Sequence, residues 1–163
     1  GVLSMIGNEY LRVVGERFRL MKKTAEEAMK QVSDSALFWT GDNESNSIAV
    51  IVNHLCGSMV SSWTDFLTAD NEKSLINRSN EFVHHFSGRQ DMMKYWELGW
   101  SKLFNTLGQL RSDDLLRVLL IRNEPHSVVE AVENQLYHYA YHVGQIVYIC
   151  KHFAVDHWKS VYA

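Results

Sequence analysis

Three histidines are the residues of this chain whose type and spacing could do chemistry. His138 and His142 stand four positions apart in a stretch with helical periodicity, so a helix would stack their rings on one face, within about 6 Å of each other. His54 occupies the corresponding flank of another helical stretch. Neutral imidazoles bind divalent ions, and three of them leave a coordination position open. The spacing therefore predicts a metal site formed by His54, His138 and His142.

The neighbours of these histidines leave two interpretations open. Ser58 follows His54 by one turn and would leave room for a pocket, while Gln145 follows His142 by one turn and would supply a polar group beside the metal. Alternatively, Gln145 is an exposed amide at the edge of the fold. The histidines would then belong to a buried polar network with amides such as Asn134 and with tyrosine hydroxyls. Neither interpretation names a substrate.

The pair His138 and His142 belongs to a helix predicted over residues 127–151. Ser127, followed three residues later by Glu130, has the pattern of a capping box at the helix start. Beyond it, apolar residues recur at alternating spacings of three and four, as on a helix that packs lengthwise on other helices. These seam residues are Val129, Val132, Leu136, Tyr139, Val143, Ile146 and Cys150. The helix should face a bundle core and carry the histidines on its flank.

Two more helices are predicted in the first half of the chain. The first covers about residues 3–32, where a continuous apolar stripe lies opposite charged residues. The segment 33–46 is rich in Gly, Asn, Asp and Ser, which favour turns, so we expect a loop. The helix that carries His54 covers about residues 47–67, with Ser47 or the asparagine before it as N-cap.

A fourth helix should begin at Ser87, with Gln90 at the capping-box position. The link before it, residues 68–87, has no sustained helical period and is longer than the usual helix-to-helix connection of about 2–8 residues. A link of this length permits a crossover between two helices that run in the same direction. After the fourth helix, residues 111–125 predict a short turn and an extended piece, with Asn123 in a left-handed turn.

The composition favours an all-α fold in a single domain, residues 1–163. The chain has one proline, and its apolar residues recur mainly at spacings of three and four, whereas an α/β protein would show several β-branched runs separated by turns. A chain of 163 residues is long enough to bury one sizeable core. We therefore predict a four-helix bundle with a long crossover between its second and third helices.

Charge and hydropathy argue against two classes of partner. The formal net charge is −3 and the basic residues are dispersed, whereas nucleic-acid binding uses a concentrated basic surface. The apolar runs are shorter than the roughly 20 residues of a membrane span, and no basic segment leads into an apolar one at the start. Cys56 and Cys150 form no paired motif, as expected for reduced thiols in a cytoplasmic protein, and neither has the setting of a nucleophile.

Several segments share a pattern with one known family. They are NSIAVIVNHL, TDFLTADNEK, the spacing of Trp96, Gly99 and Trp100, IRNEPHS, and YHYAYHVGQIVYICK. Through these segments the chain is similar, over nearly its whole length, to the DinB-like group of bacterial four-helix-bundle metalloenzymes, and to an uncharacterised Bacillus-type branch of that group. The sequence departs from the branch pattern at Ser62, where the branch has arginine, and at Asn71 and Asn123, where it has glycine.

The resemblance implies a fold, a site and a range of activities. It implies helices in up-down-down-up order, a divalent metal such as Zn, Ni, Mn or Co held by His54, His138 and His142, and frequent homodimers. The wider group includes metal-dependent transferases that use low-molecular-weight thiols such as bacillithiol, as well as hydrolases and isomerases. We therefore expect a metal-dependent enzyme that transfers a thiol to a small electrophile.

Two alternatives to thiol transfer stay open at this level. Metal-dependent hydrolysis of a small molecule would use a bound water and would need a carboxylate as general base. Asp65 lies on the flank of His54, but several turns away. The other alternative is a non-catalytic, metal-binding or dimeric scaffold. Metal content and turnover would distinguish these possibilities.

The helix over residues 127–151 also has an unusual outer face. Tyr137, Tyr141, Gly144 and Tyr148 recur at spacings of four, three and four on the side away from the seam, a position that is usually charged. Tyrosines suit protein interfaces, because the ring supplies apolar area and the hydroxyl keeps a partner. We expect either a homodimer through this face, or a cover formed by the link over residues 68–87 or by the C-terminal tail.

Overall fold

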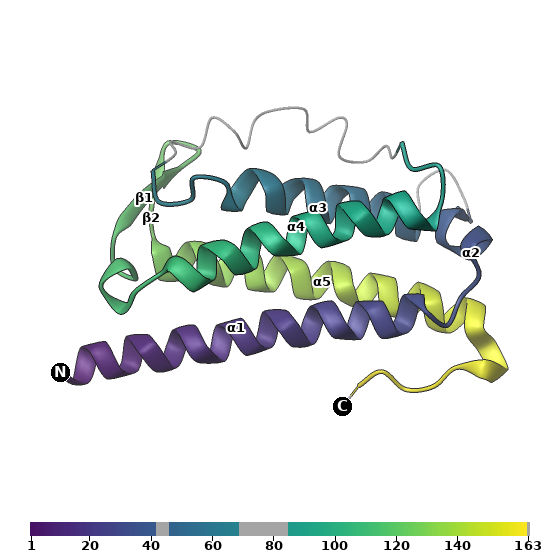
Figure 1. Ribbon diagram of the computed structural model, residues 1–163, viewed down its shortest axis with the longest axis horizontal. Helices are drawn as coiled ribbons and strands as arrows, with labels where there is room; N and C mark the ends of the chain where they lie inside the picture. Colours follow the sequence, from purple (N-terminus) through teal and green to yellow (C-terminus); the bar gives the residue numbers. More distant parts are fainter. Residues whose placement is uncertain (42–45, 69–84, 163) are drawn as a thin grey trace.

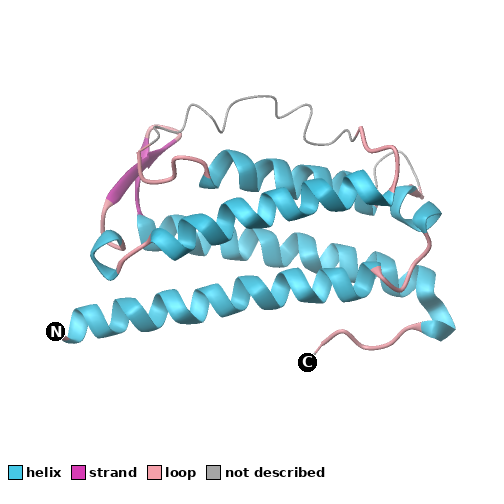
Figure 2. Ribbon diagram, in the orientation of Figure 1, coloured by secondary structure: helices cyan, strands magenta, loops and turns pink. Residues whose placement is uncertain are grey.

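A computed structural model describes residues 1–41, 46–68 and 85–162 of the chain. Four long helices lie side by side, with a small hairpin at one end (Figures 1 and 2). The helices are α1 (Val2–Met29), α2 (Asp34–Phe38), α3 (Ile48–Trp63), α4 (Arg89–Gln109) and α5 (Val128–Ala154), with 3₁₀ turns η3 (Ser112–Asp114) and η4 (Val155–His157) and strands β1 (Val118–Ile121) and β2 (Glu124–Ser127). The predicted all-α bundle is confirmed.

The order of the helices is up-down-down-up. Figure 1 shows α1 and α5 running in one direction and α3 and α4 in the other. Helices α3 and α4 therefore run parallel (Figure 1). The crossover predicted between them falls largely on residues 69–84, a range that includes Asn71 and His84 and that lies outside the described residues. None of the described helices is both long enough and apolar enough to cross a membrane.

Aromatic side chains dominate the core between the four helices. Phe18 from α1 contacts the ring of Trp63 from α3, at 6.3 Å between centroids, and that of Tyr139 from α5, at 5.9 Å. Trp96 and Trp100 from α4 are fully buried beside them. Burying one large apolar side chain contributes roughly 1.5–3 kcal/mol, so these rings are a main source of stability. The seam predicted for α5 is buried at Val132, Tyr139, Val143, Ile146 and Cys150, and half-buried at Val129 and Leu136.

Helices α3 and α4 approach each other closely at one glycine. A Cβ atom added to Gly99 would lie 2.9 Å from Cβ and 3.0 Å from Cα of Cys56, so any larger residue would force the backbones apart. Cys56 is fully buried in this contact, and burial raises the pKa of its thiol. Burial also raises the pKa of Cys150 to about 12. A thiol that stays protonated at neutral pH is a poor nucleophile, so both cysteines have a packing role.

Several helices differ from the sequence-based expectation; α1 ends at Met29 instead of near residue 32, and α5 continues to Ala154 beyond the predicted end at residue 151. The segment expected as a loop contains α2, which begins after Ser33, whose side chain accepts a hydrogen bond from the amide of Ala36. Helix α3 begins after Ser47, as predicted, but ends at Trp63 instead of near residue 67. Helix α4 begins after Gly88, because the Asp91 carboxylate, and not the Gln90 side chain, accepts hydrogen bonds from the two amides before the helix.

The extended piece predicted after α4 is a hairpin. Strands β1 and β2 pair antiparallel, with Ile121 opposite Glu124. The two residues between them, Arg122 and Asn123, have φ values of 52° and 64°. Positive φ at both central residues defines the tight turn that best matches the twist of paired strands, and asparagine tolerates it well. The hairpin leads into Ser127, whose side chain caps α5 by accepting a hydrogen bond from the Glu130 amide at 3.1 Å, as predicted.

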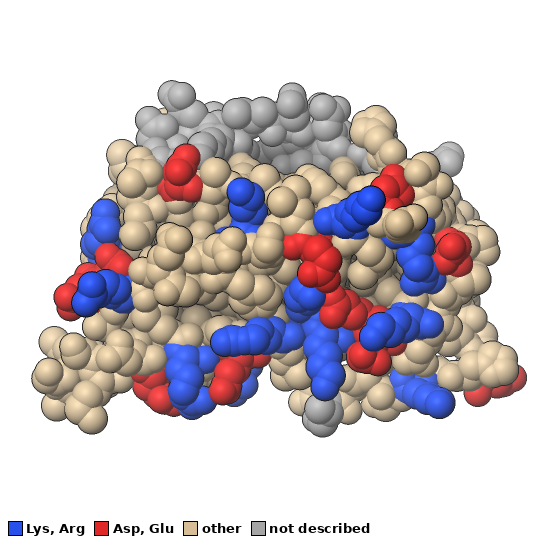
Figure 3. Space-filling view, in the orientation of Figure 1, with Lys and Arg blue, Asp and Glu red and all other residues tan. Residues whose placement is uncertain are grey.

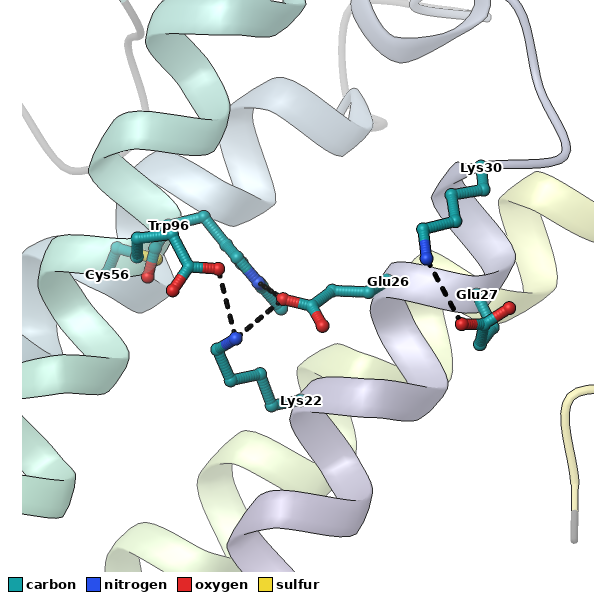
Figure 4. Close-up of polar contacts among 7 residues, drawn as sticks. Lys22, Glu26, Glu27, Lys30, Cys56 and Trp96 are labelled. Atoms are coloured by element: carbon teal, nitrogen blue, oxygen red, sulfur yellow. Dashed lines mark hydrogen bonds and ion pairs between the residues drawn. The ribbon is translucent and has the colours of Figure 1, made fainter.

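Charged side chains of both signs are interspersed on the face shown in Figure 3, without a large patch of one sign. One group of them reaches into the contact between α1 and α4 (Figure 4). Lys22 donates to Glu26 at 2.8 Å and to Glu97 at 3.0 Å, and the indole of Trp96 donates to Glu26 at 2.9 Å. This network joins the two helices through complementary polar groups.

Candidate metal centre

The site forms where the antiparallel helices α3 and α5 face each other. His54 comes from α3, and His138 and His142 come from consecutive turns of α5. A buried hydrogen bond sets the register of the two helices, because the indole of Trp63 on α3 donates to the hydroxyl of Tyr139 on α5 at 2.9 Å. Since both partners are buried, a shift of either helix would leave two polar groups unpaired. This bond thereby helps to place His54 opposite His138 and His142 along the two helices.

The three rings meet at their Nε2 atoms. Nε2 of His138 lies 3.2 Å from Nε2 of His54 and 3.0 Å from Nε2 of His142. The ring centroids of His54 and His142 are 4.7 Å apart. One ligand atom from each histidine therefore falls in a cluster whose members all lie within 4.8 Å of one another. The structure brings together all three histidines that the sequence proposed as ligands.

Hydrogen atoms alone cannot satisfy this arrangement well. Nδ1 of His142 lies 2.8 Å from the amide oxygen Oε1 of Gln145, and a carbonyl oxygen only accepts, so Nδ1 carries the hydrogen. Nε2 of a neutral His142 is then a bare lone pair aimed at His138. Nε2 of His138 can hold one hydrogen and so can donate to His54 or to His142, but not to both. At least one close nitrogen pair lacks a good hydrogen bond.

The spacing of the Nε2 atoms suits a cation between them better than hydrogen bonds among them. Metal–nitrogen bonds of about 2.0–2.1 Å with angles between octahedral and tetrahedral place neighbouring ligand nitrogens about 2.9–3.4 Å apart. The two Nε2 separations, 3.2 Å and 3.0 Å, fall in this range. Three histidines this close together could hold a metal ion. With an ion bound, the set would supply three nitrogen ligands and would leave further coordination positions for other molecules.

Burial keeps the three imidazoles in the form that binds metals. Removal from water, together with a smaller contribution from the nearby ring of His142, lowers the pKa of His54 and His138 to about 4. Burial also lowers the pKa of His142, partly opposed by its hydrogen bond to Gln145. The rings are therefore neutral at pH 7. A neutral imidazole offers the lone pair that a metal requires, so no proton has to be displaced on binding.

The two other residues proposed for the site have different surroundings. Gln145 holds His142 through the hydrogen bond to Nδ1, which fixes both the tautomer and the orientation of the ring. Ser58 contacts the hydroxyl of Tyr139. Burial raises the pKa of that tyrosine, while hydrogen bonds from Trp63 and Ser58 act in the opposite direction. Ser58 therefore supports the helix register one turn away from the cluster.

The remaining described histidines lie apart from the cluster. His126 precedes α5, where its Nδ1 contacts the carboxylate of Glu130 at 2.5 Å. His152 lines a groove further along α5. Asp65, the carboxylate noted on the flank of His54, lies in a turn beyond the end of α3, with φ of 51°, and is exposed. It is therefore not on the helix face that carries His54.

A groove of about 860 Å³ lies next to the cluster, among α2, α3 and α5. The described residues that line it are Trp39, Gly41, Asn46, Ile51, Tyr141, Gly144, Gln145, Tyr148, Ile149, His152 and Phe153. It joins the cluster through Gln145 and through Tyr141, whose ring stands edge-on to His142 at 5.2 Å between centroids. Sequence reasoning missed Trp39 and Phe153. The capping serine Ser33 ahead of a short apolar run was the signal for α2, which positions Trp39.

The tyrosines of the outer face of α5 are exposed in the single chain. Tyr137 and Tyr148 are each 78% exposed and Tyr141 is 60% exposed. The described part of the C-terminal tail instead returns toward α1, where the Lys159 amide donates to the Gln31 side chain. The tail therefore does not bury these rings, and a homodimer through this face stays a prediction.

Comparison with known proteins identifies the family. No curated protein matches the chain. A family profile does match it, over residues 5–162 of 163, and its description reads "Protein of unknown function (DUF1572)". The match spans nearly the whole chain, including α3 and α5 with all three histidines. The protein belongs to this family, DUF1572.

Proposed function

We propose that the protein is a divalent-metal-dependent enzyme of the DinB-like type, with His54, His138 and His142 as its metal ligands. The observation that carries this proposal is the convergence of three Nε2 atoms at 3.0 Å and 3.2 Å, with the lone pair of His142 directed into the cluster by Gln145. A structural polar network would pair each donor with an acceptor. In this cluster at least one close pair of Nε2 atoms lacks a good hydrogen bond, and the lone pair of His142 faces its neighbours, an arrangement that suits a cation.

The reaction we propose is transfer of a low-molecular-weight thiol, of the bacillithiol type, to a small electrophile. A bound divalent ion would supply Lewis acidity that favours the thiolate, which is the nucleophilic form. The chain contributes neutral ligands, because burial lowers the pKa of each histidine. Gln145 orients His142, and the groove beside Tyr141 gives the electrophile a place to bind next to the cluster.

Metal-dependent hydrolysis is the weaker form of the proposal. It needs a general base within hydrogen-bond reach of the attacking water. Asp65 does not serve, since it lies exposed beyond the end of α3. Gln145 does not serve either, because an amide has no basic lone pair near neutral pH. Thiol transfer makes no such demand, because the metal itself favours the thiolate.

The donor set restricts the choice of metal. Imidazole nitrogen suits Zn²⁺, Ni²⁺ and Co²⁺, whereas Mn²⁺ prefers sites with carboxylate oxygens. The three protein ligands brought together here are all imidazoles. We therefore expect Zn²⁺, Ni²⁺ or Co²⁺ to bind more tightly than Mn²⁺.

Metal content and turnover test the proposal together. Purified protein is loaded with each metal, dialysed and measured by mass spectrometry, then assayed with a panel of electrophiles with and without bacillithiol. We expect one ion per chain and thiol-dependent turnover in the wild type, and loss of both in His138→Ala. His126→Ala is the matched control, because His126 pairs with Glu130 outside the cluster. A wild type that binds no stoichiometric metal would rule out the enzyme, and metal binding without any turnover would favour a scaffold.

We also propose that the protein forms a homodimer through the outer face of α5. Three tyrosines there are 60–78% exposed, and exposed aromatic rings at regular helical spacing favour association. A two-fold contact would bring the same residues of both copies together, and because Tyr141 and Tyr148 also line the groove, this contact and a ligand in the groove would compete for them. Sedimentation of the wild type and of Tyr141→Glu tests this. We expect a dimer that the new charge converts to monomers, and an unchanged dimer or a monomeric wild type would reject this interface.

A further inference from the structure

The groove next to the three-histidine cluster extends well beyond it. Its lining residues on α5 extend from Tyr141 to Phe153, twelve residue steps along the helix, which corresponds to about 18 Å. At the near end, Tyr141 and Gln145 contact His142. At the far end, Trp39 from the segment after α2 stands edge-on to Phe153, with 5.0 Å between ring centroids. A volume of about 860 Å³ is in the range of sites for small organic molecules.

Aromatic rings provide much of the lining. Trp39, Tyr141, Tyr148 and Phe153 come from two separate elements and all border the same space. Aromatic rings favour other flat rings in edge-on or offset contacts, which add about 0.5–1.5 kcal/mol beyond the burial of area. The indole of Trp39 is 50% exposed, although an exposed tryptophan is unfavourable when nothing covers it. These features suit a flat aromatic ligand.

Apart from the imidazole of His152, the polar groups among the described lining residues of the groove are amides and hydroxyls. Among its described lining residues there is no Asp, Glu, Lys or Arg, and the hydrogen-bonding groups include the amides of Asn46 and Gln145 and the hydroxyls of Tyr141 and Tyr148. Among the described lining residues no carboxylate, ammonium or guanidinium group is available to offset the hydration that a charged ligand would lose. A neutral ligand loses less hydration, and its hydrogen-bonding groups can pair with the amides.

We propose that this groove binds an uncharged aromatic molecule, with its ring system against Trp39 and Phe153 and a polar group near Gln145. The placement of its reactive end beside His142 rests on the proposed function, whereas binding of the ring system does not. The groove thereby narrows the class of electrophile from any small molecule to neutral aromatic ones.

Gly41 offers a way to move the indole without removing it. A Cβ atom at Gly41 would lie 2.6 Å from Cη2 of Trp39, the far end of that side chain. Gly41→Ala should therefore displace the ring rather than unfold the protein. Trp39→Ala removes the ring altogether. If the aromatic wall binds the ligand, both changes should weaken binding.

The test uses three probes on the full chain, measured by isothermal titration calorimetry. The probes are 2-naphthamide, which is neutral and aromatic, 2-naphthoate, which has the same rings with a negative charge, and decalin-2-carboxamide, which is neutral and not aromatic. We expect 2-naphthamide to bind about tenfold more tightly than either of the others, equivalent to about 1.4 kcal/mol. Equal affinity for the three probes, or no binding of 2-naphthamide, would overturn the inference.

Variants locate the probe. Trp39→Ala and Gly41→Ala should each weaken binding of 2-naphthamide about tenfold. Tyr148→Ala should weaken it as well, whereas Tyr137→Ala should not, because both tyrosines lie on α5 and are 78% exposed but only Tyr148 lines the groove. Binding that is unchanged in Trp39→Ala, or weakened equally in Tyr137→Ala and Tyr148→Ala, would overturn the inference.

The same titrations separate this inference from the proposed function. His138→Ala should lose metal but still bind 2-naphthamide. A wild type that binds the probe with the expected selectivity but no metal would support the inference and reject the metal-dependent enzyme. A wild type that binds metal but not the probe would overturn the inference alone. Sedimentation is run in parallel, and a dimer that Trp39→Ala separates into monomers, with no probe bound by either protein, would show that a second copy occupies the groove and would overturn the inference.

Discussion

Two polar clusters lie between helices of this bundle, and their hydrogen bonding differs. In the contact between α1 and α4, the Glu26 carboxylate accepts from the ammonium of Lys22 and from the indole of Trp96 (Figure 4). Every pair in that cluster joins a donor to an acceptor. In the contact between α3 and α5, the Nε2 atoms of three histidines converge, and hydrogen atoms can satisfy at most part of their contacts.

This difference separates a structural role from a binding role. Burial alone would lower the pKa of Lys22 and raise that of Glu26, but their hydrogen bonds reverse both directions, so the pair stays charged and compensated. For His142 the hydrogen bond to Gln145 only partly opposes the effect of burial on the pKa, and burial together with the neighbouring rings lowers the pKa of His54 and His138. The first cluster is complete within the chain. Under the proposed function, a bound cation completes the second.

The largest expected effect is stabilisation of the folded protein by metal, which would distinguish the histidine cluster from the charged cluster. At a free concentration about 1,000 times its Kd, Zn²⁺ should stabilise the wild type by about 4 kcal/mol, since it binds only the folded chain. For a domain of this size the midpoint of thermal unfolding should rise by about 8–16 °C. Differential scanning calorimetry with and without Zn²⁺ measures this shift.

Two variants assign the shift to one cluster. His138→Ala should abolish it, because His138 contacts both other histidines. Glu26→Gln should keep it, because Glu26 belongs to the other cluster. A shift of equal size in His138→Ala and the wild type would mean that the ion binds elsewhere.

The next effect concerns the charged cluster. Glu26→Ala leaves the indole N–H of Trp96 without its acceptor and Lys22 with Glu97 alone, at a site where the side chains of Lys22 and Glu26 are each 22% exposed. An unsatisfied polar group that is largely buried costs about 1–3 kcal/mol, so the free energy of unfolding in urea should fall by about that amount. Glu27→Ala is the control, because the exposed pair of Glu27 and Lys30 (Figure 4) should contribute less than about 1 kcal/mol. Equal losses in both variants would show that the charged cluster has no special role.

A smaller effect on metal affinity is expected when the hydrogen bond that orients one proposed metal ligand, His142, is removed. Gln145→Leu keeps the approximate size of the side chain but removes the acceptor for Nδ1 of His142. Loss of such a supporting hydrogen bond lowers metal affinity by about 10- to 100-fold, and we expect the lower end because the other two ligands are unaffected. Competition titration with a chromophoric chelator measures the Kd. Gln109→Leu, at the exposed last residue of α4, should leave it unchanged.

The smallest effect is the pH dependence of the metal-free protein. The pKa of His54 and His138 is lowered to about 4 in the folded chain, below the ordinary value of 6.5, so the unfolded chain binds more protons between these values. Stability should therefore fall as pH decreases from about 6.5 to about 4. The pKa of Glu26 is lowered below 4.5, so its contribution is lost only at lower pH. Urea titrations of the wild type and His138→Ala across this range should show a flatter profile in the variant.

Local sequence patterns were sufficient for much of the fold. The four long helices followed from the spacing of apolar residues, and Ser47 and Ser127 were correctly assigned as caps, because capping depends on residues within one turn. Local patterns failed where contacts with another part of the chain determine where a helix begins or ends. The end of α3 at Trp63 and the α4 cap at Asp91 both depart from the expected positions. Helix α2 was missed because five residues are too few to show a period.

The sequence by itself determined which histidines share a face. His138 and His142 stand one turn apart on any helix, and His54 lies beside its own seam, because the side-chain direction repeats every 3.6 residues. Periodicity sets the direction of a side chain around a helix axis but says nothing about how far one helix slides along another. That sliding position was decided by tertiary contacts, chiefly the buried hydrogen bond between Trp63 and Tyr139. The groove likewise required packing, since Trp39 meets α5 only after α2 has docked, and no local pattern records a contact between residues more than a hundred positions apart.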